Sequence, residues 1–287
     1  MDAAVEAAVA RMYERFGDPL TVADIAQNAA LGLFDFSRLF KEETGVSPGK
    51  FLDAVRVGEA RKLLDATSMS ITEISRAVGY AGPDSFAGAF TAGVGLSPGR
   101  FRRLCRGEGE VPPGPQPGPA ALHGSVAGTV SLPGGHGNAR VFVGVFATAV
   151  VAYPALASAL VDVPGDRPIC YSLQGVPPGR RHLRAVAVAA GTGHDPQAVR
   201  TALVGGAARA VTVSAGEVSS AAVRLRAARP TDPPVLLALP RLEPPASVVP
   251  HPGCAAAADT AGSAGAGRLR VVSAAPVVPA GPAGSGA

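Results

Sequence analysis

The side chains best suited to chemistry form a polar stripe between residues 34 and 41. Phe34, Ser37, Arg38 and Lys41 follow the spacing i, i+3, i+4, i+7, which places them on one face of a helix. An arginine can donate two hydrogen bonds to guanine O6 and N7, and serine or lysine can bind a phosphate or a base edge. The stripe therefore predicts contact with a nucleic acid. The alternative interpretation is the solvated polar face of an amphipathic helix.

A second stripe lies about fifty residues further along the chain and differs in chemistry. Asp84, Ala87, Gly88 and Thr91 occupy the equivalent positions, with Ser85 beside them, and none of these residues is basic. Glycine also lowers helix propensity by about 1 kcal/mol relative to alanine. We expect the second helix to add little electrostatic attraction, with hydroxyl groups and backbone amides of the turn as its donors.

Basic residues return just beyond the second stripe. They are Arg100, Arg102, Arg103 and Arg106. Such a cluster can bind phosphates, and it can equally be a basic helix end that the helix dipole favours. Both interpretations stay open at this point.

An internal repeat relates the two stripes. The string GVSPGKF at residues 45–51 recurs as GLSPGRF at residues 95–101. Phe36 and Phe40 precede the first copy by the same distances as Phe86 and Phe90 precede the second. Each repeat predicts a short helix, a turn and a second helix, and this unit places its second helix in the DNA major groove.

Capping residues mark the ends of the expected helices. Thr21 and Ser70 can cap the first helix of each repeat, and Asp24 and Glu73, three residues later, can complete capping boxes. A glycine can end the second helix of each repeat, and these are Gly45 and Gly95. A Ser-Pro pair can start the helix that follows, and these pairs are Ser47-Pro48 and Ser97-Pro98. Residues 48–67 predict a connecting helix of about 27 Å. Successive groove segments on one DNA face are about 34 Å apart, so one chain could contact two of them.

The chain divides into four parts by composition. Residues 1–106 have helical periodicity, 107–121 are a Pro/Gly linker, 122–226 contain β-branched runs, and 227–287 are rich in Pro, Ala and Gly. We expect a multidomain protein with an all-α double helix-turn-helix domain, an all-β sandwich-like domain and a disordered tail. The expected strands are 125–132, 140–151, 169–173, 182–189, 210–213 and 218–225.

Residues 3–106 resemble the DNA-binding domain of the AraC/XylS family. The resemblance depends on SRLFKEETGVSP, on ARKLL, and on SF followed by GLSPGRFRR. It implies seven helices in two helix-turn-helix units, both contacting one face of DNA. The base-facing residues that it implies are Phe34, Ser37, Arg38, Asp84, Ser85 and Gly88. Gly88 and Thr91 stand where the family usually has basic residues.

The β-rich region resembles the carboxypeptidase-regulatory or transthyretin-like sandwich. The segments behind this weaker resemblance are GSVAGTVSLPGG, ARVFVGVF, YSLQGVPPGRRHLRAVAV and AVTVSAGEVSSAAVRLR. The AraC/XylS family usually places its sensor before the DNA-binding domain, whereas this region follows it. The alternative is that this region only stabilises the protein or contacts another protein.

Several function classes are disfavoured by composition. The three cysteines are far apart and fit neither a disulfide framework nor a metal site, and the five histidines lack zinc-ligand spacing. No GxSxG, HExxH or phosphate loop occurs, so we expect neither an enzyme nor a cofactor. The sequence also shows no export signal or membrane segment, and we expect a cytoplasmic protein.

These observations predict a bacterial, sequence-specific transcription regulator, and the family resemblance implies an activator. Its expected partners are double-stranded DNA and RNA polymerase, the first helix-turn-helix is expected to dominate, and the effector is not identified. The site residues for DNA are Phe34, Ser37, Arg38, Lys41, Asp84, Ser85, Gly88, Thr91, Arg100, Arg102 and Arg103. The alternative is a partner-binding module with weak or lost DNA affinity, because residues 1–106 contain 13 basic and 13 acidic residues.

Overall fold

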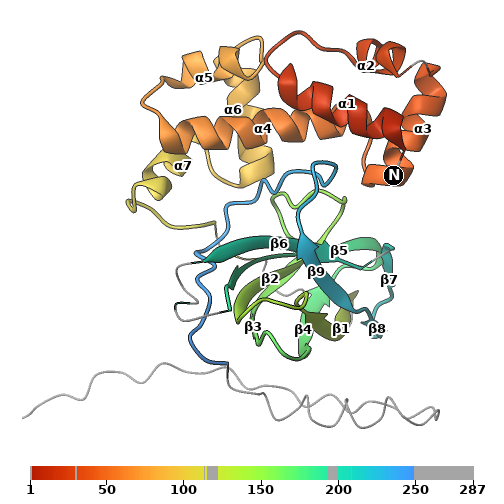
Figure 1. The fold of residues 1–287 in the computed structure, drawn as a ribbon, viewed down its shortest axis with the longest axis vertical. Coiled ribbons are helices and arrows are strands. Elements are labelled where there is room, and N and C mark those ends of the chain that lie inside the picture. The colour runs from red at the N-terminus through yellow and green to blue at the C-terminus, as the bar shows by residue number, and fades with distance from the viewer. Residues whose placement is uncertain are drawn as a thin grey trace, which may run out of the picture. The chain divides into compact units, whose positions relative to one another are not determined.

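A computed structural model describes residues 2–29, 31–112, 114, 122–192, 195, 199–207 and 209–248 (Figure 1). Most of the expected linker and everything beyond residue 248 lie outside the described residues. Residues Met1–Val248 group into one compact unit. This unit holds the helical region and the β region together.

The helical region contains the elements that the repeat predicts. They are α1 (Ala3–Glu14), α2 (Val22–Asn28), α3 (Leu33–Thr44), α4 (Pro48–Ala66), α5 (Ile71–Ala77), α6 (Pro83–Val94) and α7 (Pro98–Cys105). The pairs α2–α3 and α5–α6 are the two helix-turn-helix units, and α4 connects them (Figure 1). The expected connecting helix is confirmed.

The first helix of each unit has the predicted capping box. The Thr21 hydroxyl accepts from the Asp24 amide, and the Asp24 carboxylate accepts from the Thr21 amide; Ser70 and Glu73 repeat this exchange on α5. Gly45 and Gly95 end α3 and α6 in the left-handed conformation, with φ of 81° and 87°. Ser47 and Ser97 occupy the cap positions of α4 and α7, but their side chains make no capping hydrogen bond.

The repeat is visible in the aromatic packing as well as in the sequence. Phe40 packs against Phe36 and Phe51 with ring centroids 5.6 and 5.4 Å apart. Fifty residues later, Phe90 packs against Phe86 and Phe101 at 5.5 and 5.6 Å. The same buried triad therefore orients the second helix of each unit. Leu33 does not join the first triad, because it lies in the first turn of α3 and is 52% exposed.

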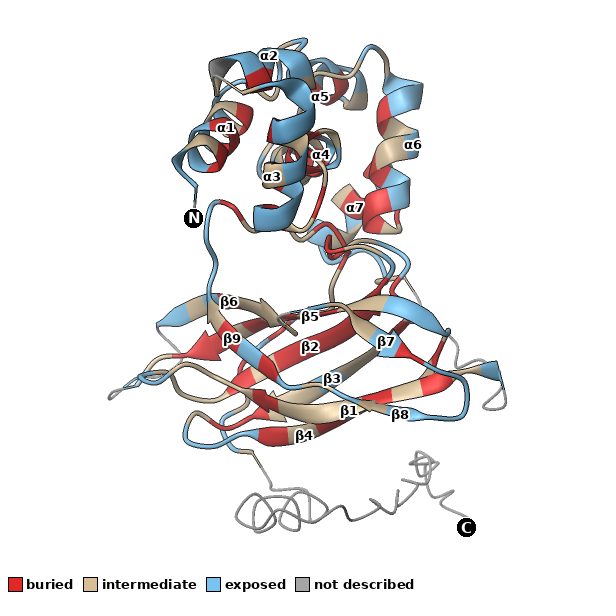
Figure 2. Cartoon of the chain, turned by 90° about the vertical axis from the view of Figure 1, so that its right-hand side faces the viewer, coloured by how far each residue is buried: buried red, intermediate tan, exposed pale blue. Residues whose placement is uncertain are grey.

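The β region forms one sheet that nearly closes on itself. Its strands are β1 (Gly124–Ser131), β2 (Ala139–Phe146), β3 (Ala157–Val163), β4 (Ile169–Val176), β5 (Gly179–Ala190), β6 (Arg200–Gly206), β7 (Val211–Val213), β8 (Val218–Ser220) and β9 (Val223–Ala227). The order is β3-β2-β5-β6-β9-β1-β4, and the end strands β3 and β4 contact each other. The expected sandwich of two sheets is not confirmed, because the pairing runs continuously around a barrel-like sheet whose buried positions are red in Figure 2.

Several strands differ from the sequence expectation, and the single strand expected at 218–225 is divided into β8 and β9. β3 and β6 were not expected, because alanine, serine and glycine weaken their strand pattern. The expected strand at residues 140–151 ends at Phe146, and the following loop turns toward the helices. Ala149 and Val150 of this loop belong to the same apolar cluster as the helical core.

The segment after β9 also packs against the helices. The disordered tail was expected to begin at residue 227, whereas Leu236 and Ala238 are buried in the helical core cluster. The Ala238 amide donates to the Val94 carbonyl at 3.0 Å, and the Tyr153 amide donates to the Gly93 carbonyl at 2.8 Å. Composition alone missed this segment because its few apolar residues lie between prolines and have no helical or strand period.

One cysteine departs from the expectation of no disulfide framework. Cys170 in β4 is disulfide-bonded, and Cys105 is free. Among the described residues, no group of three or more His, Cys, Asp or Glu side chains could hold a metal ion. No helix in the described part of the chain is long and apolar enough to cross a membrane.

Candidate nucleic-acid interface

The outer face of α3 presents the first predicted stripe to solvent. Phe34 is 80% exposed, Arg38 and Lys41 are exposed, and Ser37 is half-buried. Because Phe36 on the opposite side of the helix is fully buried, α3 cannot rotate to hide this stripe. Phe34 thus adds an apolar side chain beside two cations on this exposed face.

Arg38 is held by carboxylates of its own helix. Its guanidinium lies 3.4 Å from the Glu42 carboxylate and 4.0 Å from that of Asp35. The Arg38 side chain remains 61% exposed, so both ion pairs are weak and can exchange for another acceptor. These pairs hold the guanidinium near the outer face of α3 without burying it.

The outer face of α6 exposes the equivalent positions with different chemistry. Asp84, Ser85, Gly88 and Thr91 are all exposed. The Ser85 hydroxyl donates to the Gly82 carbonyl at 2.9 Å, and the Thr91 hydroxyl donates to the Ala87 carbonyl at 2.7 Å. Both hydroxyls use their hydrogen within the protein and offer only lone pairs outward. A Cβ at Gly88 would meet nothing within 4 Å.

The first turns of α3 and α6 lack side-chain caps, in contrast to α2 and α5. Their N-cap residues are Gly32 and Gly82, and neither helix has a side-chain capping hydrogen bond. Amides of a first turn have no partner within their own helix and carry the positive end of the helix dipole, so they suit a phosphate. From the sequence, backbone amides were expected as donors only in the second helix-turn-helix unit. The glycine that precedes the second helix of each unit was the signal for both.

The basic cluster after α6 divides into two groups. Arg100 and Arg103 are exposed, and Arg102 is only partly so. An Arg102 Nη2 group donates to the Met69 carbonyl, which fastens α7 to the connection between α4 and α5. Arg102 therefore has a structural partner, whereas Arg100 and Arg103 have none among the hydrogen bonds and ion pairs of the described residues.

A structural arginine that the sequence analysis missed links the two units. Arg56 on α4 donates from Nε to the Phe16 carbonyl and from Nη2 to the Asp18 carbonyl, each at 2.9 Å. At Gly79 a Cβ would lie 2.6 Å from the Phe16 carbonyl oxygen, so the turn after α5 packs closely on the same segment. These contacts fix α2–α3 relative to α5–α6. An arginine within the apolar pattern of α4 was the only signal in the sequence.

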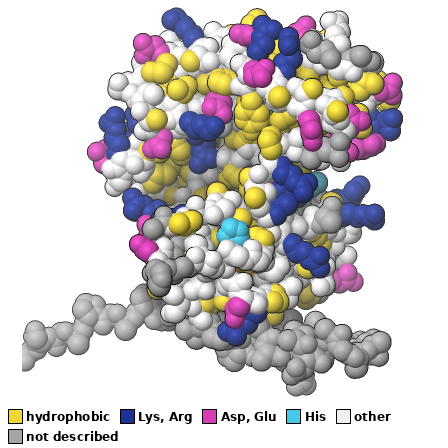
Figure 3. All heavy atoms as spheres, viewed as in Figure 1, with side chains coloured by type: hydrophobic (Ala, Val, Ile, Leu, Met, Phe, Trp, Pro, Cys, Tyr) yellow, Lys and Arg dark blue, Asp and Glu magenta, His cyan; other side chains and the backbone are white. Residues whose placement is uncertain are grey.

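The charge distribution over the helical region is mixed. Figure 3 shows basic and acidic side chains interspersed on the visible face of the helices, as equal numbers of the two would suggest. Affinity for a polyanion must therefore come from the local placement of Arg38, Lys41 and the first-turn amides, since the summed charge provides little attraction.

Comparisons with known proteins agree with this geometry for the helical region. Residues 25–104 match the family model described as a helix-turn-helix domain. The uncharacterized HTH-type transcriptional regulator YfiF of Bacillus subtilis is 35% identical over 91 residues, which is 32% of this chain and 29% of that protein. The RCS-specific HTH-type transcriptional activator RclR of Escherichia coli is 30% identical over 100 residues, or 35% of each chain.

A solved structure covers the same share of the chain. The DNA-binding domain of AdpA, described as the global transcriptional factor in complex with a target DNA, is 28% identical, with 38% of this chain and 100% of that chain covered and a TM-score of 0.36. The chain spans about a third of the length of the curated relatives that it matches. The helical region is thus a helix-turn-helix domain, and it is similar in sequence to the matching regions of these transcriptional regulators.

Proposed function

We propose that the protein is a sequence-specific, DNA-binding transcription regulator in which α3 dominates recognition. One observation supports this most strongly. The second helix of each repeat exposes the same four-position stripe, anchored by the same phenylalanine triad, beside a first turn without a side-chain cap. A purely structural repeat would need the triad but not the exposed Phe34.

The roles of individual residues follow from their exposure and chemistry. Arg38 reads guanine by two hydrogen bonds, Phe34 makes apolar contact with a base such as thymine, and Lys41 and Ser37 bind phosphate or a base edge. Asp84, Ser85, Gly88 and Thr91 form a second, weaker contact, because they have no cation and their hydroxyls donate inward. Arg100 and Arg103 bind phosphate beyond α6, and Arg102 supports them by holding α7.

Three further assignments are proposals of the same kind. The name of RclR contains the word activator, and we propose activation through RNA polymerase as the mode of this chain too. We propose a cytoplasmic, non-enzymatic protein, consistent with regulators among its relatives. We also propose that the β region is the regulatory part of the protein. We propose further that it is related to carboxypeptidase-regulatory domains, which its sequence resembles.

Selection of bound sequences from random duplex DNA tests the proposal. The full chain should enrich a motif, and its affinity for that duplex should fall steeply as salt rises. A matched control is the double variant Arg38→Ala, Lys41→Ala, which should enrich no motif. If the wild-type chain enriches nothing and binds the selected and scrambled duplexes equally, the proposed function is wrong.

A further inference from the structure

A cavity of about 380 Å³ opens over the sheet where β5, β6 and β9 run side by side. Strand register pairs Arg184 of β5 with Gly206 of β6, and Gly206 with Arg224 of β9. Registered residues of adjacent strands point to the same face. Because Gly206 has no side chain, the two arginines flank a bare stretch of backbone at the floor of the cavity.

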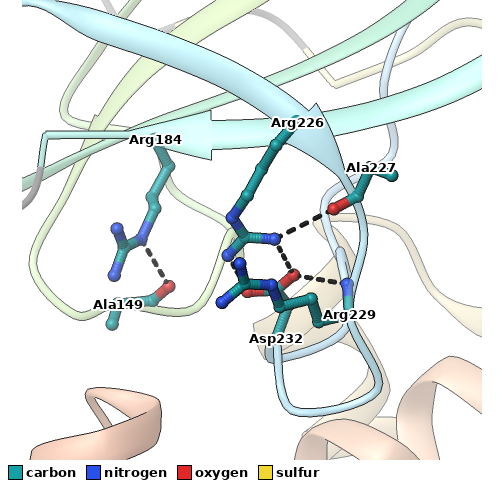
Figure 4. Close-up of polar contacts among 6 residues, drawn as sticks. All are labelled: Ala149, Arg184, Arg226, Ala227, Arg229 and Asp232. Atoms are coloured by element: carbon teal, nitrogen blue, oxygen red, sulfur yellow. Dashed lines mark hydrogen bonds and ion pairs between the residues drawn. The ribbon is translucent and has the colours of Figure 1, made fainter. Parts of the chain in front are cut away.

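Arg184 is fixed in place but keeps free donors. Its Nε donates to the Ala149 carbonyl at 3.1 Å (Figure 4). A Cβ at residue 206 would lie 3.0 Å from Nη1, so the guanidinium covers the glycine. Among the described residues, neither Nη1 nor Nη2 has a hydrogen-bond partner. Burial lowers the pKa of Arg184, which reflects the hydration that its charged group has lost.

The one aspartate in the cavity is already occupied. Asp232 accepts two hydrogen bonds from Arg226, at 2.6 and 2.7 Å, and a third from the Arg229 amide at 2.7 Å. Figure 4 shows this carboxylate between Arg226 and the turn at Arg229, with Arg184 held separately at Ala149. Asp232 therefore neutralises Arg226 and has little capacity left for the guanidinium groups of Arg184, Arg224 and Arg229.

Basic residues outnumber acidic residues in the lining of the cavity. Besides Asp232, its acidic residues are Glu42 and Glu43 of α3, and Glu42 pairs with Arg38 on its own helix at 3.4 Å. A partly buried guanidinium that has lost hydration favours an acceptor for its remaining donors. The planar fork of an arginine matches the two oxygens of a carboxylate or phosphate.

We propose that this cavity binds a small organic anion through a carboxylate or phosphate group, with Arg184 as the anchor and Arg224 and Arg229 at its mouth. The volume is near the lower end of the roughly 300–1,000 Å³ range of small-molecule sites. A DNA backbone is a poorer occupant, because the Arg184 guanidinium lies inside the cavity against Ala149 and Gly206.

The same cavity lies against the end of α3. Glu42, Glu43, Thr44 and Gly45 line it, and a Cβ at Gly45 would lie 3.0 Å from the Ala149 Cβ. Ala149 thus contacts the end of α3 and accepts the hydrogen bond from Arg184. An anion bound to Arg184 would act on this junction, so it would be an effector that changes DNA affinity. This last step rests on the proposed function of α3.

Calorimetric titration of the full chain with sodium phosphate, and separately with sodium succinate, tests the site without DNA. Ionic strength is held constant with sodium chloride. At least one probe should bind saturably at a single site, at least tenfold more weakly in Arg184→Gln and about threefold more weakly in Arg224→Gln. Arg167→Gln, an exposed arginine in the β3–β4 turn, is the matched control and should bind like wild type.

The outcomes separate the site from the proposed function. If neither probe binds, or if both cavity variants bind like wild type, the anion site is wrong; Arg224 is exposed, so its variant stays informative even if Arg184→Gln fails to fold. Anisotropy with the selected duplex should then show a threefold or larger change on adding the bound probe, absent in Arg184→Gln. No change overturns the effector role alone. Absence of duplex binding under every condition overturns the proposed function and with it the effector role, and it leaves the anion site unaffected. Weaker duplex binding by Arg184→Gln without any small anion would assign the arginines to the DNA backbone instead.

Discussion

Replacing Arg38 by alanine is the most direct test of how α3 contacts DNA. A bidentate contact to guanine contributes about 1–3 kcal/mol. In the free protein Arg38 has two exposed ion pairs, to Glu42 at 3.4 Å and to Asp35 at 4.0 Å, and each contributes a few tenths of a kcal/mol. Because wild type gives up these pairs on binding, the net loss in Arg38→Ala should be about 1–2 kcal/mol, or about 5- to 30-fold.

Fluorescence anisotropy on the selected duplex and on single-base variants measures this loss. Arg38→Ala should also relax the preference at one or two base pairs, whereas Lys41→Ala should weaken binding to all duplexes and reduce the salt slope by about one unit. Glu42→Gln removes a competitor for the guanidinium and should tighten binding by about twofold. If Asp84→Ala lowers affinity more than Arg38→Ala does, recognition is not dominated by α3.

Three other variants or conditions test separate parts of the argument. Gly88→Arg should tighten duplex binding several-fold, because its Cβ meets nothing within 4 Å and the change adds a cation and helix propensity; abolished binding in anisotropy would contradict this. Hydrogen bonds within the capping boxes lower the pKa of Asp24 and Glu73, so the stability they add is present above about pH 4 and is lost as pH falls through the folded pKa values. Thermal melts from pH 7 to 3 should show this loss, and the Asp24→Asn, Glu73→Gln double variant should flatten it; an equal slope in both proteins would refute the assignment. Truncation after residue 229 should lower Tm by several degrees relative to truncation after Val248, because it removes the buried Leu236 and Ala238; equal Tm values in the two truncated chains would show that the segment does not stabilise the fold.

The helical region was predictable because each level of its sequence agrees with the next. Capping boxes, left-handed glycines and the phenylalanine triads all repeat at about the same offset, and local signals of this kind determine where helices begin, end and pack. The outward stripes followed directly from the position of Phe36 and Phe86. The uncapped first turns were missed, because a glycine before a helix is a weak signal in isolation.

The β region and the cavity were less predictable for a physical reason. Pairing of Arg184 with Gly206 and of Gly206 with Arg224 joins residues from three strands, and one of these strands, β6, had no recognisable pattern. Register depends on contacts between strands, which no local pattern specifies. The packing of Leu236 on the helical core is of the same kind, because its neighbour in space is Gly93, far away in the sequence.

The attachment points of the β region suggest how the two regions could communicate. Tyr153 and Ala238 donate backbone hydrogen bonds to Gly93 and Val94, at the last turn of α6, and Ala149 contacts Gly45 at the end of α3. Both attachments lie at the C-terminal ends of the helices, whereas the proposed DNA contacts begin at their N-terminal ends. A helix transmits displacement along its axis, because hydrogen bonds between successive turns keep it stiff. A ligand that moves the Ala149 loop can therefore displace the outer stripe of α3 without contacting DNA. We expect α6 to stay in place during that movement, because two backbone hydrogen bonds attach it to the β region.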